Sequence, residues 1–176
     1  MIRPTHPDGT PLTIREQLER RGARKAKRAE KGAVLWREKV KRAKSKTTAQ
    51  LEAIFWDVFS FFIRTRDKRA SVAAGLPPLC FYCEKRPIEC AMHRIKRGKR
   101  ATKYDERNVD GGCHWCNDKD RFWPQEFDAI FIRKKGSEVF LELDVLSRQE
   151  CKRSRADIIE QTAVYKEKTR TMLLAG

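Results

Sequence analysis

Two Cys-x-x-Cys pairs constrain the fold of this 176-residue chain more than any other feature. Cys80 and Cys83 form the first pair, Cys113 and Cys116 form the second, and 29 residues separate the two pairs. Four thiolates spaced in this way complete the tetrahedral shell that zinc prefers, with each pair forming one knuckle. The spacing therefore predicts a structural zinc site that closes the segment between the pairs into a loop.

The chain is also strongly basic. It has 40 Lys and Arg against 24 Asp and Glu, a net charge of +16 and a pI of about 9.9. Such an excess favours a polyanionic partner, most simply nucleic acid, although a basic protein without such a partner is the alternative. No run of 18 apolar residues occurs and no apolar segment of a signal peptide follows Met1, so we expect a cytoplasmic protein without a membrane span. In that compartment thiols stay reduced, which favours a metal over disulfides.

We expect a basic N-terminal arm over residues 1–46 and one domain over residues 47–176. Residues 1–50 contain 15 Lys and Arg against 5 Asp and Glu, and residues 1–13 contain three prolines that indicate an irregular start. From 14 to 46 the composition favours helix, but apolar residues are too sparse for a buried face. A solvated helix or an arm that orders on DNA fits this pattern, and a disordered solubilising tail is the alternative.

The domain is expected to be mostly helical. Apolar residues recur at helical spacing between 51 and 63, after a cap at Thr47 or Thr48; they are Leu51, Ile54, Phe55, Val58, Phe59, Phe62 and Ile63. Gly75 and the two prolines after it end this helix. Further helices are expected over 126–134 and over 156–174, the latter capped by Ser154 with Ile158 and Ile159 inward. Residues 138–147 fit a helix better than a strand.

Three polar residues around the second knuckle indicate chemistry beyond zinc binding. His93 and Asn108 lie between the two cysteine pairs, and Asn117 directly follows Cys116. Imidazole can take a proton from water near neutral pH, and phosphodiester hydrolysis also needs a cation to offset the charge that develops on the phosphate. An isolated histidine is otherwise a structural residue. The position of His93 between two knuckles, with Asn108 in register, favours the catalytic interpretation.

This series of His, Asn and Asn resembles the HNH signature of ββα-metal nucleases. In that family the first His lies on a strand as general base, the central Asn fixes the loop that carries it, and the last position lies on a helix and holds a divalent metal. The resemblance therefore implies that His93 is the base and that Asn108 orients it. It also implies that Asn117 helps to hold a catalytic Mg²⁺ or Mn²⁺.

A narrower resemblance comes from the run Arg100-Ala-Thr-Lys-Tyr-Asp-Glu-Arg-Asn-Val109 followed by Cys113-x-x-Cys116-Asn117. It looks like the NinG/Rap recombination endonucleases of lambdoid bacteriophages, and the similarity covers roughly residues 47–174. The resemblance implies a structure-selective endonuclease that nicks branched recombination intermediates, such as Holliday junctions and D-loops, in the cytoplasm of a bacterial host. Because such junctions have two-fold symmetry, a homodimer is a further expectation by analogy.

Two positions depart from the HNH pattern. Met92 stands directly before the proposed base, where many HNH enzymes have a metal-binding Asp or His, and Cys90 stands where an Asp is expected. The acidic ligand of the catalytic metal is therefore left open among five carboxylates nearby in the sequence, which are Glu89, Asp105, Asp110, Asp118 and Glu126.

Basic residues between the proposed base and Asn108 are expected to position DNA phosphates without reading bases. They are Arg94, Lys96, Arg97, Lys99, Arg100, Lys103 and Arg107. Together these inferences predict an α+β fold, mostly α, in which a zinc-knuckle ββα-metal core is embedded in a helical scaffold and acts as a DNA endonuclease. A non-catalytic, zinc-dependent DNA-binding protein is the alternative, and an RNA-binding factor is a weaker third.

Overall fold

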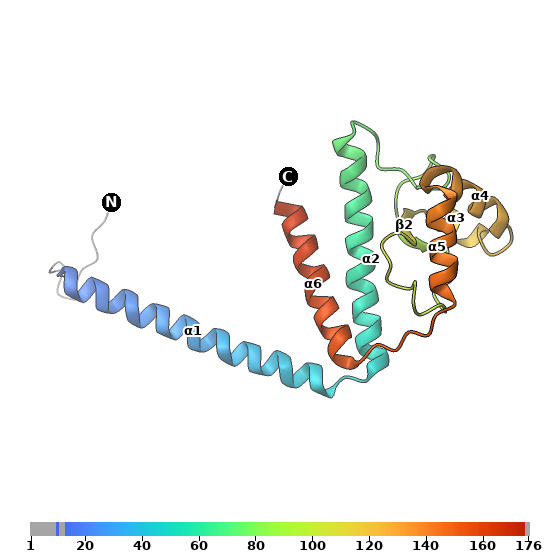
Figure 1. Ribbon diagram of the computed structural model, residues 1–176. Helices are drawn as coiled ribbons and strands as arrows, with labels where there is room; N and C mark the ends of the chain where they lie inside the picture. Colours follow the sequence, from blue (N-terminus) through green and yellow to red (C-terminus); the bar gives the residue numbers. More distant parts are fainter. Residues whose placement is uncertain (1–9, 11–12, 175–176) are drawn as a thin grey trace. The chain divides into compact units, whose positions relative to one another are not determined.

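The computed structural model describes residues 10 and 13–174, and it is mostly helical with one small antiparallel sheet (Figure 1). The elements are α1 (Ile14–Ser45), α2 (Thr48–Ala73), β1 (Cys90–His93), β2 (Val109–Gly112), α3 (His114–Lys119), α4 (Pro124–Lys135), α5 (Ser137–Ser147) and α6 (Arg155–Leu174). The expectation of an α+β fold that is mostly α is therefore confirmed at this level. The chain divides into two compact units, Met1–Thr47 and Thr48–Gly176.

The first unit contains α1, a single helix of 32 residues. It begins with a reciprocal cap in which the Thr13 amide donates to Glu16 Oε2 (2.8 Å) and the Glu16 amide donates to Thr13 Oγ1 (3.3 Å). Even its apolar residues Ile14 and Leu18 are 79% and 61% exposed. The solvated helix expected from the charge pattern is therefore present. The irregular start expected for residues 1–13 lies almost entirely outside the described residues.

Helix α2 is the centre of the second unit. Of the predicted apolar stripe, Leu51, Phe55, Phe59, Phe62 and Ile63 are buried. The helix begins at Thr48, ends at Ala73 and is followed by Gly75 in the left-handed conformation (φ 69°). The predicted stripe and the predicted stop are both confirmed.

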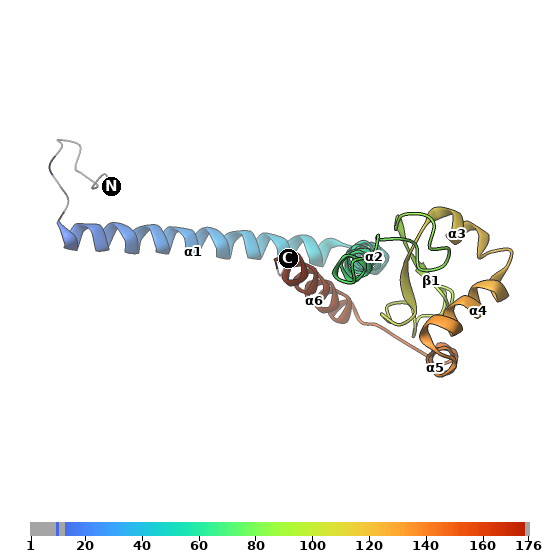
Figure 2. The same ribbon diagram turned by 90° about the horizontal axis from the view of Figure 1, so that it is seen from above.

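Helix α6 lies alongside α2, as both views show (Figures 1 and 2). Ser154 caps α6, because its hydroxyl accepts from the Asp157 amide (3.2 Å). Tyr165 packs its ring 4.9 Å from that of Phe59 on α2. Ile158 is fully buried in this interface, but the expectation that Ile159 also points inward is wrong, since it is 42% exposed. One residue along a helix is a rotation of about 100°, which carries Ile159 out of the interface.

The two strands separate two apolar cores. Side chains alternate along β1, so Ala91 joins the core of α2 and α6, whereas Met92 joins a second core with the cysteines and with residues of α4 and α5. Gly112 on β2 is required by this packing, because a Cβ atom there would lie 2.3 Å from Met92 Sδ. The sheet therefore has one face toward α2 and one toward the cysteines.

Helices α4 and α5 cover the second core. Pro124 occupies the first turn of α4, and Gly136 (φ 93°) ends it, as the sequence predicts. The ambiguous segment after Gly136 forms α5, a helix rather than a strand, with Leu143 as its buried apolar residue. Across residues 13–174, no helix combines the length and the apolar character needed to cross a membrane.

Candidate functional site

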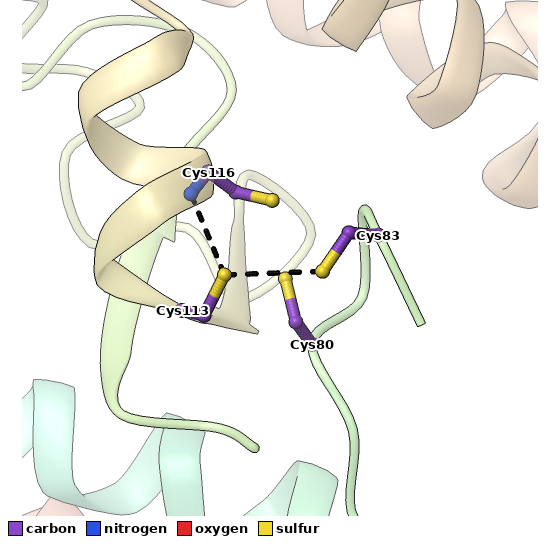
Figure 3. Close-up of side chains that lie close together, drawn as sticks. All are labelled: Cys80, Cys83, Cys113 and Cys116. Atoms are coloured by element: carbon purple, nitrogen blue, oxygen red, sulfur yellow. Dashed lines mark hydrogen bonds between the residues drawn. The ribbon is translucent and has the colours of Figure 1, made fainter. Parts of the chain in front are cut away.

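The four cysteines of the two pairs converge beside the sheet (Figure 3). Their Sγ atoms all lie within 4.8 Å of one another, and those of Cys83 and Cys113 are 3.9 Å apart. Zinc–sulfur bonds of about 2.3 Å in a tetrahedron place the sulfur atoms about 3.8 Å apart. The cluster can therefore hold a metal ion, and its geometry is compatible with zinc. Within the described part of the chain, no other group of three or more His, Cys, Asp or Glu side chains converges in this way.

Backbone geometry preorganises the cysteine cluster. Cys113 caps α3, because its Sγ accepts from the Cys116 amide at 3.4 Å. Burial and the neighbouring sulfur atoms raise the pKa of Cys116 and of Cys80, since thiolates this close repel one another. Burial acts in the same direction on Cys83, but amide donors of the knuckle outweigh it and lower its pKa to about 7. A bound cation would remove the repulsion and make four thiolates compatible.

His93 ends β1 with its ring fixed on two sides. Its Nε2 lies 2.8 Å from the carbonyl oxygen of Lys103, so this nitrogen carries the proton and Nδ1 keeps its lone pair. The ring stacks on Trp56 of α2, with the centroids 4.7 Å apart. Burial lowers the pKa of His93 to about 4, opposed by the Lys103 carbonyl and assisted by the positive charge of Arg97. The imidazole is therefore neutral at physiological pH.

Asn108 is completely buried and holds the loop between the strands. Its Oδ1 accepts from the Ile95 amide (2.7 Å), and its Nδ2 donates to the carbonyls of Ile95 and Thr102 (3.0 Å each). Thr102 directly precedes the residue whose carbonyl binds His93. The side chain of Asn108 therefore acts on His93 through the loop and not by direct contact.

His93 and Asn117 line one cleft of about 560 Å³, which brings together two of the three residues that the HNH resemblance implies. The cleft is formed mainly by α2, β1, the loop after β1 and α3, and its lining residues are Trp56, Ser60, Cys90, Ala91, His93, Lys96, Arg97, His114, Asn117, Asp120 and Arg121. Asn117 is placed there because it directly follows Cys116, a member of the cysteine cluster. The same turn of helix thus belongs to both sites.

None of the five carboxylates considered from the sequence lines this cleft. Glu89 accepts from the His114 amide (2.9 Å), and Asp105 is paired with Arg107 (2.8 Å). The remaining three are Asp110, which is buried and paired with Lys135 (2.6 Å), Glu126, which lines a different hollow, and Asp118, which is exposed. Among the described lining residues the only carboxylate is Asp120, and its Oδ1 lies 2.5 Å from a nitrogen of Arg94.

The seven basic residues expected at DNA divide into two groups. Lys96, Arg97, Lys99 and Arg100 are exposed on the loop after β1, and the first two line the cleft. The other three are held more closely by carboxylates: Arg94 by Asp120 and Asp128, Lys103 by Glu52, and Arg107 by Asp105 and Glu142, whereas the exposed Arg100 lies 3.8 Å from Glu52. Arg94 is only 6% exposed, so it braces α3 against α4 and is not placed to contact a phosphate.

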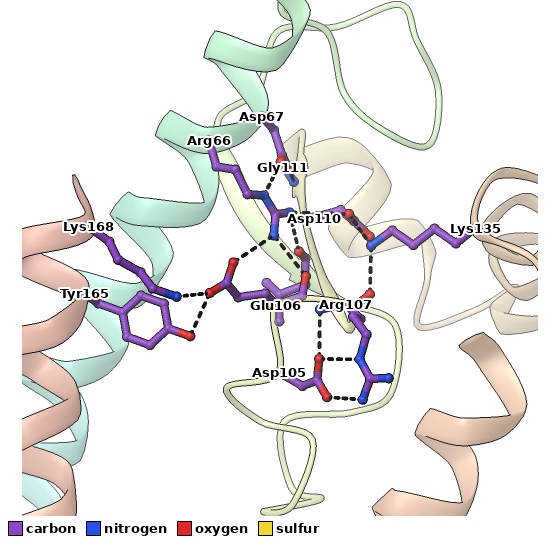
Figure 4. Close-up of polar contacts among 11 residues, drawn as sticks. Arg66, Asp67, Asp105, Glu106, Arg107, Asp110, Gly111, Lys135, Tyr165 and Lys168 are labelled. Atoms are coloured by element: carbon purple, nitrogen blue, oxygen red, sulfur yellow. Dashed lines mark hydrogen bonds and ion pairs between the residues drawn. The ribbon is translucent and has the colours of Figure 1, made fainter. Parts of the chain in front are cut away.

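The run from Tyr104 to Val109 connects the loop to the helices, and Figure 4 shows the contacts of Glu106 within it. Arg66 of α2 donates to the backbone carbonyls of Glu106 and Val109 at 3.0 Å. The Glu106 carboxylate accepts from Tyr165 (3.1 Å) and Lys168 (2.7 Å) of α6. Tyr104 stacks on Phe55, with 4.0 Å between ring centroids. These residues are structural, and they fix the loop whose carbonyl orients His93.

Sequence reasoning missed three residues of the cleft. His114 was given no role, Trp56 lies off the buried stripe of its helix, and Asp120 was not among the carboxylates considered. Spacing alone contained a signal for two of them, because His114 and Asp120 lie three residues before and after Asn117, on the same side of a helix. Comparisons with protein-family models, curated proteins and solved structures give no match for this chain.

Proposed function

We propose that the chain is a metal-dependent, structure-selective DNA endonuclease of the HNH type, similar to the NinG/Rap recombination endonucleases of lambdoid phages. The observation that carries this proposal is the cleft in which a neutral, oriented His93 on β1 meets Asn117 on α3. The order strand, strand, helix, with a candidate zinc site at the base of the helix, supports the proposal, because a ββα-metal core has its elements in the same order. Branched recombination intermediates such as Holliday junctions and D-loops are the proposed substrates, as the resemblance implies.

In the proposed reaction His93 is the general base. With Nε2 donating to the Lys103 carbonyl, Nδ1 accepts a proton from a water molecule, and the water oxygen forms a bond to the phosphorus as the bond to the 3′ oxygen breaks. The leaving 3′ oxygen takes a proton from solvent, so the products carry a 5′ phosphate and a 3′ hydroxyl. Trp56 keeps the imidazole plane in place during the transfer.

A divalent cation would supply charge that offsets the developing negative charge on the phosphate and on the leaving oxygen. Asn117 and Asp120 are the oxygen donors of the cleft that would hold it, and His114 lies beside them. Mg²⁺ is commonly held by one or two protein oxygens, with water and substrate phosphate completing its shell. The two donors Asn117 and Asp120 are consistent with such a site.

The exposed basic residues give the cleft its affinity for phosphates. Lys96, Arg97, Lys99 and Arg100 lie on one loop beside His93, and α1 adds further positive charge in the first unit. Contacts of this kind position a backbone without reading its sequence, which is sufficient for an enzyme that selects substrates by shape. The zinc proposed for the four cysteines is structural, because no position of the cluster is left for a substrate.

One observation favours a second function, that of a zinc-dependent DNA-binding protein without cleavage. Met92 supplies no carboxylate before His93, and Asp120, the one acid among the described residues of the cleft, is shared with Arg94. If this pairing prevents Asp120 from binding a cation, the same surfaces bind branched DNA and leave it intact.

Cleavage of a labelled four-way junction, a D-loop and a linear duplex in Mg²⁺, Mn²⁺ or EDTA tests the two functions. We expect His93→Ala to reduce the cleavage rate by roughly 100-fold to 10,000-fold, the usual contribution of a general base. His114→Ala serves as the matched control in the same cleft, and its smaller loss should be recovered at higher cation concentration. Circular dichroism and zinc content establish that both variants are folded.

The results of this assay distinguish an endonuclease from a non-catalytic DNA-binding protein. Cleavage that persists in His93→Ala removes His93 from its role as base. Tight binding of the junction with no cleavage in any cation supports the non-catalytic function. Equal affinity for the junction and the linear duplex argues against selection by structure.

A further inference from the structure

Three aromatic side chains lie exposed on and just after α3, and none of them lines the cleft that contains His93. Trp115, Phe122 and Trp123 are 48%, 72% and 44% exposed. They do not hold the helix in place, because Cys116 is the only buried residue of α3. We call this group, together with Lys119 and Arg86, the indole face. Large rings left in water need a reason, since burying them would stabilise the protein.

Cations lie over both indoles of this face. Lys119 Nζ is 5.7 Å from the ring centroid of Trp115 and 4.5 Å from that of Trp123, so it lies between the two rings. The guanidinium carbon of Arg86 is 4.6 Å from the centroid of Trp115. Trp115 and Lys119 are one helical turn apart on α3, and after the helix the Trp123 amide donates to the Lys119 carbonyl (3.2 Å), which produces this alternation of ring, charge and ring.

The face borders a hollow of about 330 Å³. Its lining residues are Tyr82, Cys83, Trp115, Cys116, Lys119, Trp123, Glu126, Phe127 and Ile130. The walls are therefore largely flat and aromatic, and Glu126 brings the only carboxylate of the described lining. A ring that enters this hollow would meet indole surface, while a phosphate attached to it would meet Lys119 or the exposed Lys85 and Arg86.

We propose that the indole face binds unpaired nucleotides by stacking their bases on Trp115 and Trp123. Alternating aromatic rings and cations match a single strand, because every base offers a π face and every nucleotide carries a phosphate. The bases of a duplex are already stacked on one another, so the face favours unpaired strands. The positive charge of the indole face would repel a cationic partner. A partner that offers only phosphate would leave the exposed rings without a contact.

The place of the face on α3 connects it to the proposed nuclease. His114 and Asn117 of that helix line the cleft, whereas Trp115 and Lys119 belong to the indole face. One short helix therefore has a reaction side and a stacking side. This role rests on the proposed function. The indole face would hold an unpaired segment next to a branch point, while a neighbouring phosphate enters the cleft beside His93.

Fluorescence anisotropy without added divalent cation measures the binding itself. The probes are labelled oligothymidylate of about 12 nucleotides, an abasic strand of the same length and a duplex. We expect the wild-type protein to bind oligothymidylate more tightly than the abasic strand. The double variant Trp115→Ala/Trp123→Ala should lose roughly 5-fold to 150-fold for each stacked base and should bind the two strands alike. The salt dependence should change little, because the phosphate contacts remain.

A matched control comes from α2, where Phe61 is 49% exposed and lies 5.9 Å from the guanidinium carbon of Arg64. Phe61→Ala removes an exposed ring beside a cation elsewhere and should leave binding unchanged. Trp115→Phe/Trp123→Phe keeps flat rings and should recover most of the affinity. Zinc content is measured for each variant, because Trp115 adjoins Cys116.

Two results overturn this inference. The first is equal binding of oligothymidylate and abasic strand by the wild-type protein. The second is a double variant that keeps its affinity for the single strand but changes its oligomeric state, which would make the face a contact between copies of the chain. Since no cleavage is measured, a protein without nuclease activity still gives a clear result, and a failure of stacking leaves the role of His93 standing.

Discussion

Replacing Asn108 by Ala should be among the most damaging single changes in the domain. The side chain is completely buried and makes three hydrogen bonds of 2.7–3.0 Å to backbone groups of the loop after β1. Each buried backbone group left without a partner costs about 1–3 kcal/mol, and Ile95, which provides two of the three, is only half-buried. We therefore expect a loss of about 3–4 kcal/mol in the free energy of unfolding.

Asn108→Asp has nearly the same size and gives a distinct signature. Its second carboxyl oxygen would replace Nδ2 and face the carbonyl oxygens of Ile95 and Thr102, so the folded protein should favour the protonated acid. The pKa of the new carboxyl is then higher in the folded than in the unfolded state, where it is about 3.9. The contribution of this carboxyl to stability should therefore be greatest at low pH, and it should fall by about 1.4 kcal/mol per pH unit as the pH rises from 3.9 to the folded-state pKa.

Urea unfolding followed by far-ultraviolet circular dichroism at several pH values measures both effects, with total zinc held constant. The free energy of unfolding of Asn108→Asp should fall relative to that of Asn108→Ala as the pH rises from 4 to 7. The reasoning is refuted by a loss below about 1 kcal/mol for the alanine variant, or by a difference between the two variants that does not depend on pH.

The remaining predictions concern other parts of the domain. Burial lowers the pKa of His93 to about 4, so the imidazole stays unprotonated in mild acid. The rate of cleavage should therefore be constant from neutral pH down to about pH 5. A rate that falls to half near pH 6.5 would contradict this. Folding stability should fall with pH from 6.5 toward 4, where only the unfolded state gains the proton. Cys116→Ser should lower zinc below one ion per chain by mass spectrometry and reduce helicity by circular dichroism. Arg66→Met should cost about 2–4 kcal/mol in urea unfolding, since two carbonyls and Asp67 lose a charged donor, whereas Lys68→Met, at an exposed position, should cost under 0.5 kcal/mol.

Local patterns in the sequence predicted the helices because their causes are local. The stripe from Leu51 to Ile63 reports the buried face of α2, and Pro124 and Gly136 delimit α4. The cysteine spacing was equally informative, because knuckles are short turns that bring their own ligands together. In each case the residues that decide the structure lie within one or two turns of one another.

The pairing of charged groups could not be predicted in the same way. In the sequence Arg66 is one of several basic residues near the end of α2. In the structure it donates to the carbonyls of Glu106 and Val109, which are 40 and 43 residues away. Asp110 reads as an available carboxylate, but Lys135 of α4 holds it, and burial raises its pKa to about 6. Arg94 reads as a DNA contact, yet two carboxylates after α3 and on α4 hold it in the interior. These assignments depend on the packing of distant segments, which spacing along the chain does not reveal.

The alternation of side chains along β1 explains why Met92 departs from the HNH pattern. It also leaves α3 as the element that would hold the proposed cation. Ala91 and His93 face α2, so Met92 must face the cysteines, where an apolar side chain fills the second core. The proposed catalytic cation must then be held from α3, by Asn117 and Asp120 one turn apart. Cys113 and Cys116 fix that helix, and Cys116 directly precedes Asn117. The zinc proposed at the cysteines would therefore set the distance from the proposed cation to His93, and its removal would abolish the proposed cleavage through geometry, although the proposed reaction gives zinc no chemical role.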